Sequence, residues 1–396
     1  MSIETGMAFS ALPTPRIHFG AGTLAKLPAL AAAFGRRMLL VTGSRTLQRS
    51  PSASAMLDDL RRVGIECQRL EVEREPSPEL IDEAVALGRV TPFEVVVAIG
   101  GGSAVDAGKA ISAMLLQREP VERFIEGQPG FMPHDGRKVP FIAVPTTSGT
   151  GTEATSNAVI SRVGPGGYKR SLRHAAFVPN EAIIDPDLMT TAPPELTAAS
   201  GMDAFTQLLE AWLSPLASPY TDAVCMSGLE RFSRSFELAC GSGASDVSVR
   251  ADMAYAALMS GIALSNAGLC IVHGFASSVG GLFDIPHGTL CATLLAESTH
   301  ENIRQLSATE VGEPGLRKFA TASRILTGAT TGNLADDCNR LVEHLESLQT
   351  LLAFPRLGEF GVREADFDVI IPATRSKTNA VPLDAESMRR ILAARL

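Results

Sequence analysis

Cysteine is scarce in this 396-residue sequence, and no two cysteines lie close together. A disulfide framework and a zinc knuckle both require regularly spaced cysteines, and no CxxC pair is present to indicate either. The pattern is typical of reduced thiols in a cytoplasmic protein, which is where we expect this chain to act. The six cysteines lie at positions 67, 225, 240, 270, 291 and 338.

Positively charged residues are also too few to indicate a basic surface that would bind nucleic acid. The chain has 35 Lys and Arg against 43 Asp and Glu, which gives a formal net charge of −8. Because binding to nucleic acid depends on clustered positive charge, we expect no such partner. Residues 1–20 lack a basic stretch followed by an apolar one, so we expect no secretory signal.

One stretch lacks charge altogether. From Ala254 to Phe283 there is no Asp, Glu, Lys or Arg, and this length could span a bilayer. However, the stretch contains Asn266, His273 and several serines and glycines, and no basic flank anchors it. A pair of buried helices in a soluble protein explains these features better, so we expect no membrane association.

Apolar runs alternate with helical patterns in the first half of the chain. This alternation predicts a parallel sheet with helices on both faces. From about Pro193 the strand patterns stop and long helical patterns take over. The strands are expected at 38–42, 67–72, 95–99, 140–147 and 181–186, and the helices at 51–63, at 78–90 and from about 104.

A glycine turn is the first chemical signal. Gly100 to Ser103 follow the strand at 95–99 and lead into the helix expected from Ala104. Glycines allow close approach of the backbone to a ligand, and the N–H groups at a helix start attract a pyrophosphate. The pattern is not GxGxxG, so a merely tight strand-to-helix turn is the alternative.

A second loop, residues 145–153, is rich in hydroxyls and glycine. It follows the strand expected at 140–147, at the end of the sheet where ligands of open α/β folds bind. Its hydroxyls could bind phosphate, ribose or an amide; alternatively, Thr152 and Glu153 could cap a following helix. Two such loops after neighbouring strands favour a nucleotide ligand.

Three side chains in the second half have the chemistry of metal ligands. His273 and His287 lie in nearly uncharged surroundings, and the proline in 283–286 predicts a turn that could bring them together. Asp203 also lies in an apolar setting, where a lone carboxylate is costly unless paired or coordinated. Such a set could hold Zn²⁺ or Fe²⁺ with room for a substrate oxygen. The alternatives are satisfied core histidines and a carboxylate at a helix start.

Five motifs occur in order between residues 100 and 288: GGGSAVDAGKA (100–110), PTTSGTGTEAT (145–155), AIIDPDLM (182–189), SGMDAFTQLLEAW (200–212) and VHGFASSVGGLFDIPHG (272–288). Together they resemble the iron-containing, or group III, alcohol dehydrogenases, and the resemblance extends over roughly residues 12–390. The resemblance implies an α/β dinucleotide-binding domain over residues 1–190 and an all-helical metal- and substrate-binding domain over 191–396. This architecture, shared with dehydroquinate synthase, would place the active site between the domains. It also implies a homodimer or a larger homo-oligomer.

The resemblance implies the site residues as well. The pyrophosphate, ribose and nicotinamide of NAD or NADP would contact Gly43, Gly100, Gly101, Gly102, Ser103, Asp106, Thr146, Thr147, Thr150, Asn157 and Lys169. Asp203, His273 and His287 would be both the catalytic residues and the ligands of Fe²⁺ or Zn²⁺. Gln207 stands at the position of the family's fourth ligand.

Three positions depart from the family pattern. Gln207 replaces a histidine, so the fourth ligand is either this neutral amide or water, or the metal binds poorly. Ser277 replaces a second histidine of the last motif, which puts a proton relay through that position in doubt. Gly43, with Arg45 nearby, stands where many NAD-preferring members carry an aspartate, and this makes NADP use possible.

These features predict hydride transfer between a nicotinamide and an alcohol or aldehyde, with the metal as Lewis acid on the substrate oxygen. A lyase resembling 3-dehydroquinate synthase is one alternative, but it would need a basic pocket that the sequence does not indicate. A nucleotide-binding member with a weakened or empty metal site is the other, suggested by Gln207 and Ser277.

Overall fold

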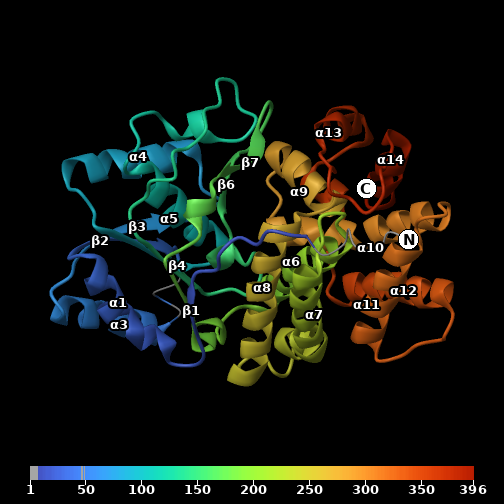
Figure 1. Cartoon of the computed structure of the whole chain (residues 1–396), viewed down its shortest axis with the longest axis horizontal. Coiled ribbons are helices and arrows are strands. Elements are labelled where there is room, and N and C mark those ends of the chain that lie inside the picture. The colour runs from blue at the N-terminus through green and yellow to red at the C-terminus, as the bar shows by residue number, and fades with distance from the viewer. Residues whose placement is uncertain (1–7, 46–47, 49) are drawn as a thin grey trace.

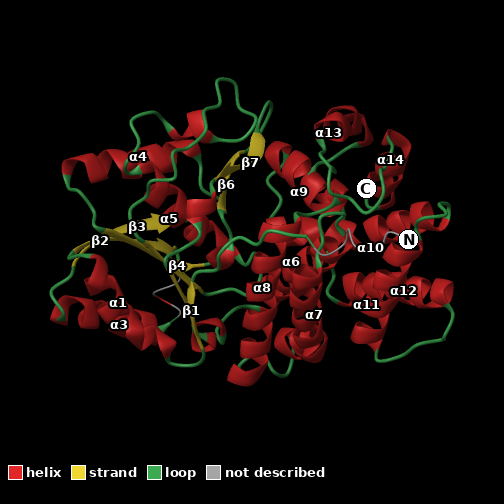
Figure 2. Cartoon of the chain, viewed as in Figure 1, coloured by secondary structure: helices red, strands yellow, loops and turns green. Residues whose placement is uncertain are grey.

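The computed structural model describes residues 8–396 except 46, 47 and 49. Two halves lie side by side, and the strands of the described residues belong to the first half only (Figures 1 and 2). Phe9 stacks on Tyr220, and Leu12 donates its backbone N–H to Asn266 Oδ1 at 2.8 Å. The start of the described chain therefore packs on the helical half.

The first half is built on a parallel sheet with the strand order β1-β8-β5-β4-β2-β3. All six residues of β4 are buried, as the apolar sequence VVVAIG requires in a sheet covered on both faces. The strands are β1 (Arg16–Phe19), β2 (Arg37–Gly43), β3 (Glu66–Val72), β4 (Val95–Gly100), β5 (Phe141–Pro145) and β8 (Glu181–Ile184).

Helices cover the sheet on both faces, namely α1 (Leu27–Phe34), α3 (Pro51–Arg62), α4 (Pro78–Val90) and α5 (Gly102–Met114). Successive residues of a strand point to opposite faces, and β2 shows the result. Met38 and Leu40 join the hydrophobic cluster of α1 and α3, whereas Leu39 and Val41 join that of α4 and α5. The predicted α/β architecture is confirmed.

The sequence analysis missed three strands. β1 is only four residues long and lies at the sheet edge, half exposed. The other two, β6 (Asn157–Arg162) and β7 (Tyr168–Arg173), form an antiparallel hairpin. Their many polar residues resemble a loop in sequence, but several of them face a cleft described below. This hairpin positions part of the site.

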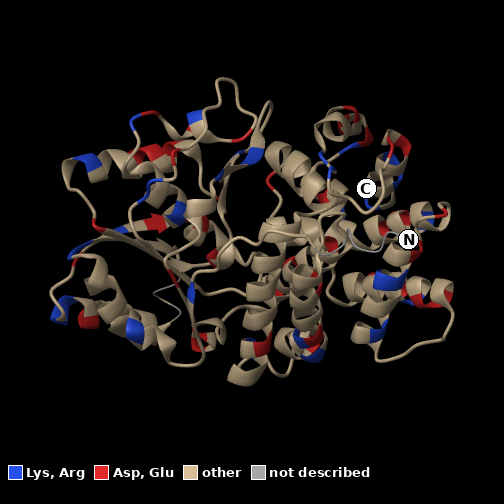
Figure 3. Cartoon of the chain, viewed as in Figure 1, with Lys and Arg blue, Asp and Glu red and all other residues tan. Residues whose placement is uncertain are grey.

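The second half is entirely helical among the described residues. Its helices are α6 (Pro194–Leu213), α7 (Pro219–Cys240), α8 (Val247–Ala267), α9 (Ile271–Leu282), α10 (His287–Ser307), α11 (Glu313–Thr327), α12 (Leu334–Leu351), α13 (Phe367–Ala373) and α14 (Ala385–Ala394). Prolines at the first positions of α6 and α7 start these helices without loss of a hydrogen bond. In Figure 3 the central helices α6 and α8 are mostly uncharged, and both signs of charge are interspersed elsewhere.

The charge-free stretch forms the end of α8 and the whole of α9. By length and composition α8 could cross a membrane, but most of its apolar window is buried inside the protein. It packs between α6 and α7 on one side and the loop after β5 on the other. The predicted pair of buried helices is confirmed.

The two halves meet at two glycines. A Cβ at Gly261 of α8 would overlap the carbonyl group of Gly151, and a Cβ at Gly151 would overlap the backbone of Ala257 and Gly261. Gly151 also has a φ of +59°, a conformation that other residues rarely adopt. Glycine at both positions therefore lets the loop after β5 lie directly on the helical half.

A buried lysine holds the same loop to α5. Lys109 Nζ donates to the carbonyl oxygens of Thr152, Thr155 and Asn157 at 2.6, 3.0 and 2.8 Å. It also donates to the hydroxyls of Thr152 and Thr155 at 3.1 and 2.7 Å. Burial lowers the pKa of Lys109 to about 8 and raises the pKa of the neighbouring Glu153 to about 7.

Glu153→Gln is expected to stabilise the protein above neutral pH much more than in acid. The raised pKa means that folded Glu153 keeps a proton that the unfolded chain releases, so wild type loses stability as pH rises from 4.5 to about 7. Glutamine removes this loss, and the free energy of unfolding should rise by on the order of 3 kcal/mol near pH 8. Denaturant unfolding near pH 4 and pH 8 measures the difference; a gain that does not change with pH would contradict the prediction.

Candidate active site

A cleft of about 1450 Å³ lies between the two halves. Pockets for small molecules usually measure about 300–1,000 Å³, so this one has room for a dinucleotide beside a substrate. Its walls come from the turn before α5, the loop after β5, the β6–β7 hairpin, and helices α6, α9 and α10.

The residues predicted to contact the cofactor line this cleft, with one exception. Gly100 is buried at the end of β4, where its carbonyl oxygen accepts a hydrogen bond from the Thr146 N–H at 2.9 Å. The lining residues are Gly43, Gly101, Gly102, Ser103, Asp106, Thr146, Thr147, Thr150, Asn157 and Lys169.

The two predicted loops lie against one another at the cleft. A Cβ at Gly102 would lie 2.7 Å from Thr150 Cγ2, and one at Gly101 would touch the Thr147 side chain at 3.5 Å. Glycine at 102 therefore allows the loop after β5 to cover the start of α5, whose N-terminus can attract a phosphate. The loop does not cap a long helix, because a single 3₁₀ turn, Thr152–Ala154, leads directly toward β6.

Asp106 and Asn157 line the cleft with different partners. Asp106 accepts a hydrogen bond from the Thr152 hydroxyl, and burial raises its pKa. Asn157 donates from Nδ2 to Ser171 Oγ at 3.1 Å. Its Oδ1 atom is buried without a hydrogen-bond partner among residues 8–396 as described. This oxygen is therefore an unpaired acceptor on a residue that lines the cleft.

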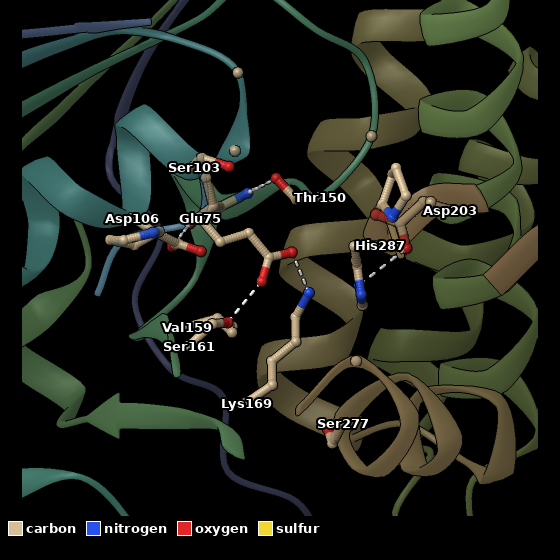
Figure 4. Close-up of a pocket in the computed structure, with 18 of the residues that line it drawn as sticks. Glu75, Ser103, Asp106, Thr150, Val159, Ser161, Lys169, Asp203, Ser277 and His287 are labelled. Atoms are coloured by element: carbon tan, nitrogen blue, oxygen red, sulfur yellow. Dashed lines mark hydrogen bonds and ion pairs between the residues drawn. The ribbon is translucent and has the colours of Figure 1, made fainter. Parts of the chain in front are cut away.

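Lys169 on the hairpin forms an ion pair with Glu75, which follows β3 (Figure 4). Ser161 Oγ donates to the same carboxylate at 2.6 Å. Burial alone would raise the pKa of Glu75, but the Lys169 ammonium outweighs it and holds this pKa below its usual range. The sequence analysis missed Glu75, since no motif marks it and only the folded hairpin brings Lys169 to it.

Asp203, His273 and His287 converge from three helices on the other side of the cleft. Figure 4 shows the contact between Asp203 and His287. Asp203 Oδ1 lies 3.3 Å from His273 Nε2 and 3.5 Å from His287 Nε2. The imidazole centroids are 5.4 Å apart, because the turn at 283–286 carries the chain back as predicted. Asp203 lies in the middle of α6, so the alternative of a helix-start carboxylate is wrong.

The donor atoms of this cluster fit a divalent metal. Asp203 Oδ1 is buried and has no hydrogen-bond partner within the described part of the chain. Burial lowers the pKa of His287 to about 4, so its imidazole is neutral at physiological pH, the form that binds metals. A carboxylate oxygen and two imidazole nitrogens that face one another are typical ligands of Zn²⁺ and Fe²⁺.

Glu210, which the sequence analysis missed, fixes His273 in this position. Its Oε2 atom lies 2.7 Å from His273 Nδ1, and its Oε1 atom accepts the Val272 N–H at 2.7 Å. A carboxylate on the outer nitrogen of a histidine holds the ring so that the inner nitrogen faces a metal. Glu210 lies seven residues after Asp203, two turns along one face of α6, and this spacing is the signal that could have found it.

Cys291 is a second residue that the sequence analysis missed. It follows His287 by four residues on α10 and is fully buried. Its Sγ atom lies 3.9 Å from His273 Nε2 and 4.0 Å from His287 Nε2. Burial raises the pKa of this thiol to about 11, so without a metal it is neutral.

Gln207 and Ser277 are the two residues in this region that depart from the family pattern, and they lie in different surroundings. Gln207 lies beside Asp203 on the cleft wall, and its Oε1 atom accepts a hydrogen bond from Ser260 Oγ at 2.8 Å. Ser277 donates to the backbone oxygen of His273 at 3.1 Å and lies apart from Asp203 and His287 (Figure 4).

Two family models match the chain in succession. One, iron-containing alcohol dehydrogenase, matches residues 13–186, and the other, the C-terminal part of the Fe-containing alcohol dehydrogenase family, matches residues 197–396. The chain belongs to the iron-containing alcohol dehydrogenases. It is 32% identical to an NADPH-dependent butanol dehydrogenase of Clostridium saccharobutylicum, over 89% of this chain and 86% of that protein. It is also 32% identical to a 1,3-propanediol dehydrogenase of Klebsiella pneumoniae, over 87% of each chain.

Solved structures of the family have the same fold. A 1,3-propanediol oxidoreductase superposes with a TM-score of 0.87 at 29% identity, covering 98% of this chain and all of that one. An archaeal alcohol dehydrogenase from a Red Sea brine pool superposes with a TM-score of 0.89 at 26% identity, covering 99% of this chain and 100% of that one. The chain is thus an oxidoreductase of the metal-dependent alcohol dehydrogenase class.

Proposed function

We propose that this enzyme interconverts a small alcohol and its aldehyde with NADP(H) or NAD(H), at a divalent metal, Fe²⁺ or Zn²⁺, held by Asp203, His273 and His287. The observation that carries the proposal is the convergence of these three side chains on one wall of the cleft. The opposite wall is formed by the glycine turn before α5 and the loop after β5, the two segments expected to bind the nucleotide. The relatives named for butanol and 1,3-propanediol support a short aliphatic substrate.

Each part of the cleft has a role in this reaction. A metal in the site would act as a Lewis acid on the substrate oxygen, and the nicotinamide would exchange the hydride. Gly101, Gly102 and Ser103 would hold the pyrophosphate at the start of α5, and the threonines of the loop after β5 would line the nicotinamide. Leu264, Leu269 and Phe283 also line the cleft and would keep water from the substrate.

The test is a screen of aldehyde reduction with both nicotinamides. Propanal and butanal should support oxidation of NADPH or NADH, the activity should disappear on treatment with a chelator, and Fe²⁺ or Zn²⁺ should restore it. Turnover of a phosphorylated sugar acid without net oxidation of the nicotinamide, and no aldehyde reduction, would favour the lyase instead.

The residues at the end of β2 favour NADP(H) over NAD(H) as the cofactor. Gly43, Ser44 and Arg45 line the cleft there, so a glycine stands in place of the carboxylate that would repel a 2′-phosphate, and an arginine lies two residues further on. Gly43→Asp should therefore lower the ratio of kcat/KM for NADPH to that for NADH by about 10- to 100-fold, the range of one hydrogen bond to a charged group. Gly43→Asn is the matched control of equal size, and an equal change in both variants would show that charge is not the cause.

We also propose that the enzyme acts in the cytoplasm as a homodimer or larger homo-oligomer, with small molecules as its ligands and neither membrane nor nucleic acid as a partner. All six cysteines are free, which supports a reducing compartment. Analytical ultracentrifugation of the purified protein would test the assembly, and a monomer at micromolar concentration would contradict it.

A further inference from the structure

Two residues are candidates for the fourth protein ligand of a metal held by Asp203, His273 and His287. Gln207 lies one turn after Asp203 on α6, and Cys291 lies one turn after His287 on α10. Residues four apart share a helix face, so each candidate lies next to the ligand that precedes it. Their other contacts distinguish the two.

The sulfur of Cys291 belongs to the donor cluster by distance. One ligand atom each from Asp203, His273, His287 and Cys291 all lie within 4.8 Å of one another. A tetrahedral site with bonds of about 2.0–2.3 Å separates its ligand atoms by about 3.3–3.8 Å. The two imidazole nitrogens are 3.9 and 4.0 Å from the Cys291 Sγ atom, so small side-chain shifts suffice to close the site.

Gln207, in contrast, has its carbonyl oxygen engaged by a residue outside the cluster. Its carbonyl oxygen accepts the Ser260 hydroxyl at 2.8 Å, and that hydroxyl lies within α8. Ser260 therefore anchors the Gln207 side chain in this orientation, whereas the contacts of the Cys291 sulfur are to the two imidazoles of the metal cluster.

Cys291 and Gln207 also differ in their relation to the cleft. Asp203, Gln207, His273 and His287 line it, whereas Cys291 is fully buried and lies outside the cleft wall. A ligand at Cys291 holds the metal from the protein side. It leaves the cleft side, where a substrate oxygen must arrive, free of a fourth protein ligand.

We propose that Cys291, and not Gln207, is the fourth protein ligand of the metal in this enzyme, an inference that rests on the proposed metal site. On binding, the S–H bond breaks, the proton leaves to solvent, and a sulfur–metal bond forms. A set of one thiolate, two imidazoles and one carboxylate favours Zn²⁺ over Fe²⁺, because thiolate is the softer donor and Zn²⁺ lies above Fe²⁺ in intrinsic affinity.

Cobalt substitution tests the proposal without an activity assay. Metal-free enzyme titrated with Co²⁺ should bind one ion per chain and develop the near-ultraviolet charge-transfer absorption of a cobalt thiolate. Cys291→Ser should lose this absorption and bind Co²⁺ at least about tenfold more weakly, since even outer-shell changes cost 10–100-fold. Cys225→Ser, which replaces a buried thiol of α7, is the matched control and should keep both properties.

A rescue variant extends this test, and a spectroscopic measurement on wild type covers the case in which Cys291→Ser does not fold. The double variant Cys291→Ser/Gln207→His carries the family's histidine and should regain tight binding without the thiolate absorption. X-ray absorption of the zinc-loaded wild type should show one sulfur neighbour of the metal. A spectrum with nitrogen and oxygen neighbours only would overturn the proposal.

The outcomes separate this inference from the proposed function. If wild type binds one Co²⁺ per chain without thiolate absorption, or if Cys291→Ser retains the absorption, Cys291 is not a ligand and the metal-dependent dehydrogenase remains. If wild type binds no metal at all, both the ligand assignment and the proposed function are wrong.

Discussion

Asp203→Ala is expected to remove the metal and to lower kcat/KM for aldehyde reduction by about a thousandfold. Asp203 is the single carboxylate of the donor cluster, and it lies within 3.5 Å of both imidazole nitrogens. Its loss leaves only the two imidazoles and the Cys291 sulfur, a smaller donor set that holds a divalent cation less tightly. A metal acting as Lewis acid supplies several kcal/mol, and each 1.36 kcal/mol is a factor of ten in rate. Elemental analysis and steady-state kinetics on the same preparation measure both effects.

A carboxylate elsewhere in the helical half serves as the control for this variant. Asp222 on α7 pairs with Lys318 at 2.9 Å, and Asp222→Ala should keep metal and activity. Full metal content together with full activity in Asp203→Ala would show that the reaction does not depend on this carboxylate.

Glu210→Gln is expected to weaken metal binding by about 10- to 100-fold, the usual cost of losing an outer-shell partner. The glutamate holds His273 Nδ1 at 2.7 Å and also accepts the Val272 N–H at the start of α9. Glutamine keeps the size of the side chain but removes the negative charge that strengthens the ring as a donor. Competition with a metal-sensitive dye measures the dissociation constants of both proteins.

Excess metal provides the control for Glu210→Gln. Activity should approach the wild-type value at saturating metal, because the ligands themselves are intact. An unchanged dissociation constant would show that Glu210 only anchors α9, and a deficit that excess metal cannot restore would point to a direct part in the reaction.

The layered α/β half could be predicted because each central strand is a short apolar run bounded by glycine, proline or charge. β4 and its glycine turn are the clearest case. The β6–β7 hairpin could not be recognised in the same way. Its strands carry Asn157, Ser161 and Lys169, whose polarity reflects the cleft that they face. The pattern of a strand that lines a polar cleft is close to that of a loop.

The three metal-ligand candidates could be predicted from chemistry, since two histidines and an aspartate in apolar surroundings need one another. The residues that support them depend on helix register. Glu210 could have been found from its spacing after Asp203, whereas Cys291 becomes recognisable only once the bounds of α10 place it on the same helix face as His287. Glu75 lies outside any such pattern, because its pairing with Lys169 depends on how the hairpin folds over the sheet.

The central claim, a metal-dependent alcohol dehydrogenase with its metal at Asp203, His273 and His287, is tested most directly by a metal titration. Metal-free enzyme is titrated with Zn²⁺, and in parallel with Fe²⁺ under anaerobic conditions, while NADPH oxidation by butanal is followed. The account predicts no activity at the start and a linear rise that ends at one metal ion per chain. Full activity before any metal is added, or none at any metal concentration in folded protein, would contradict it.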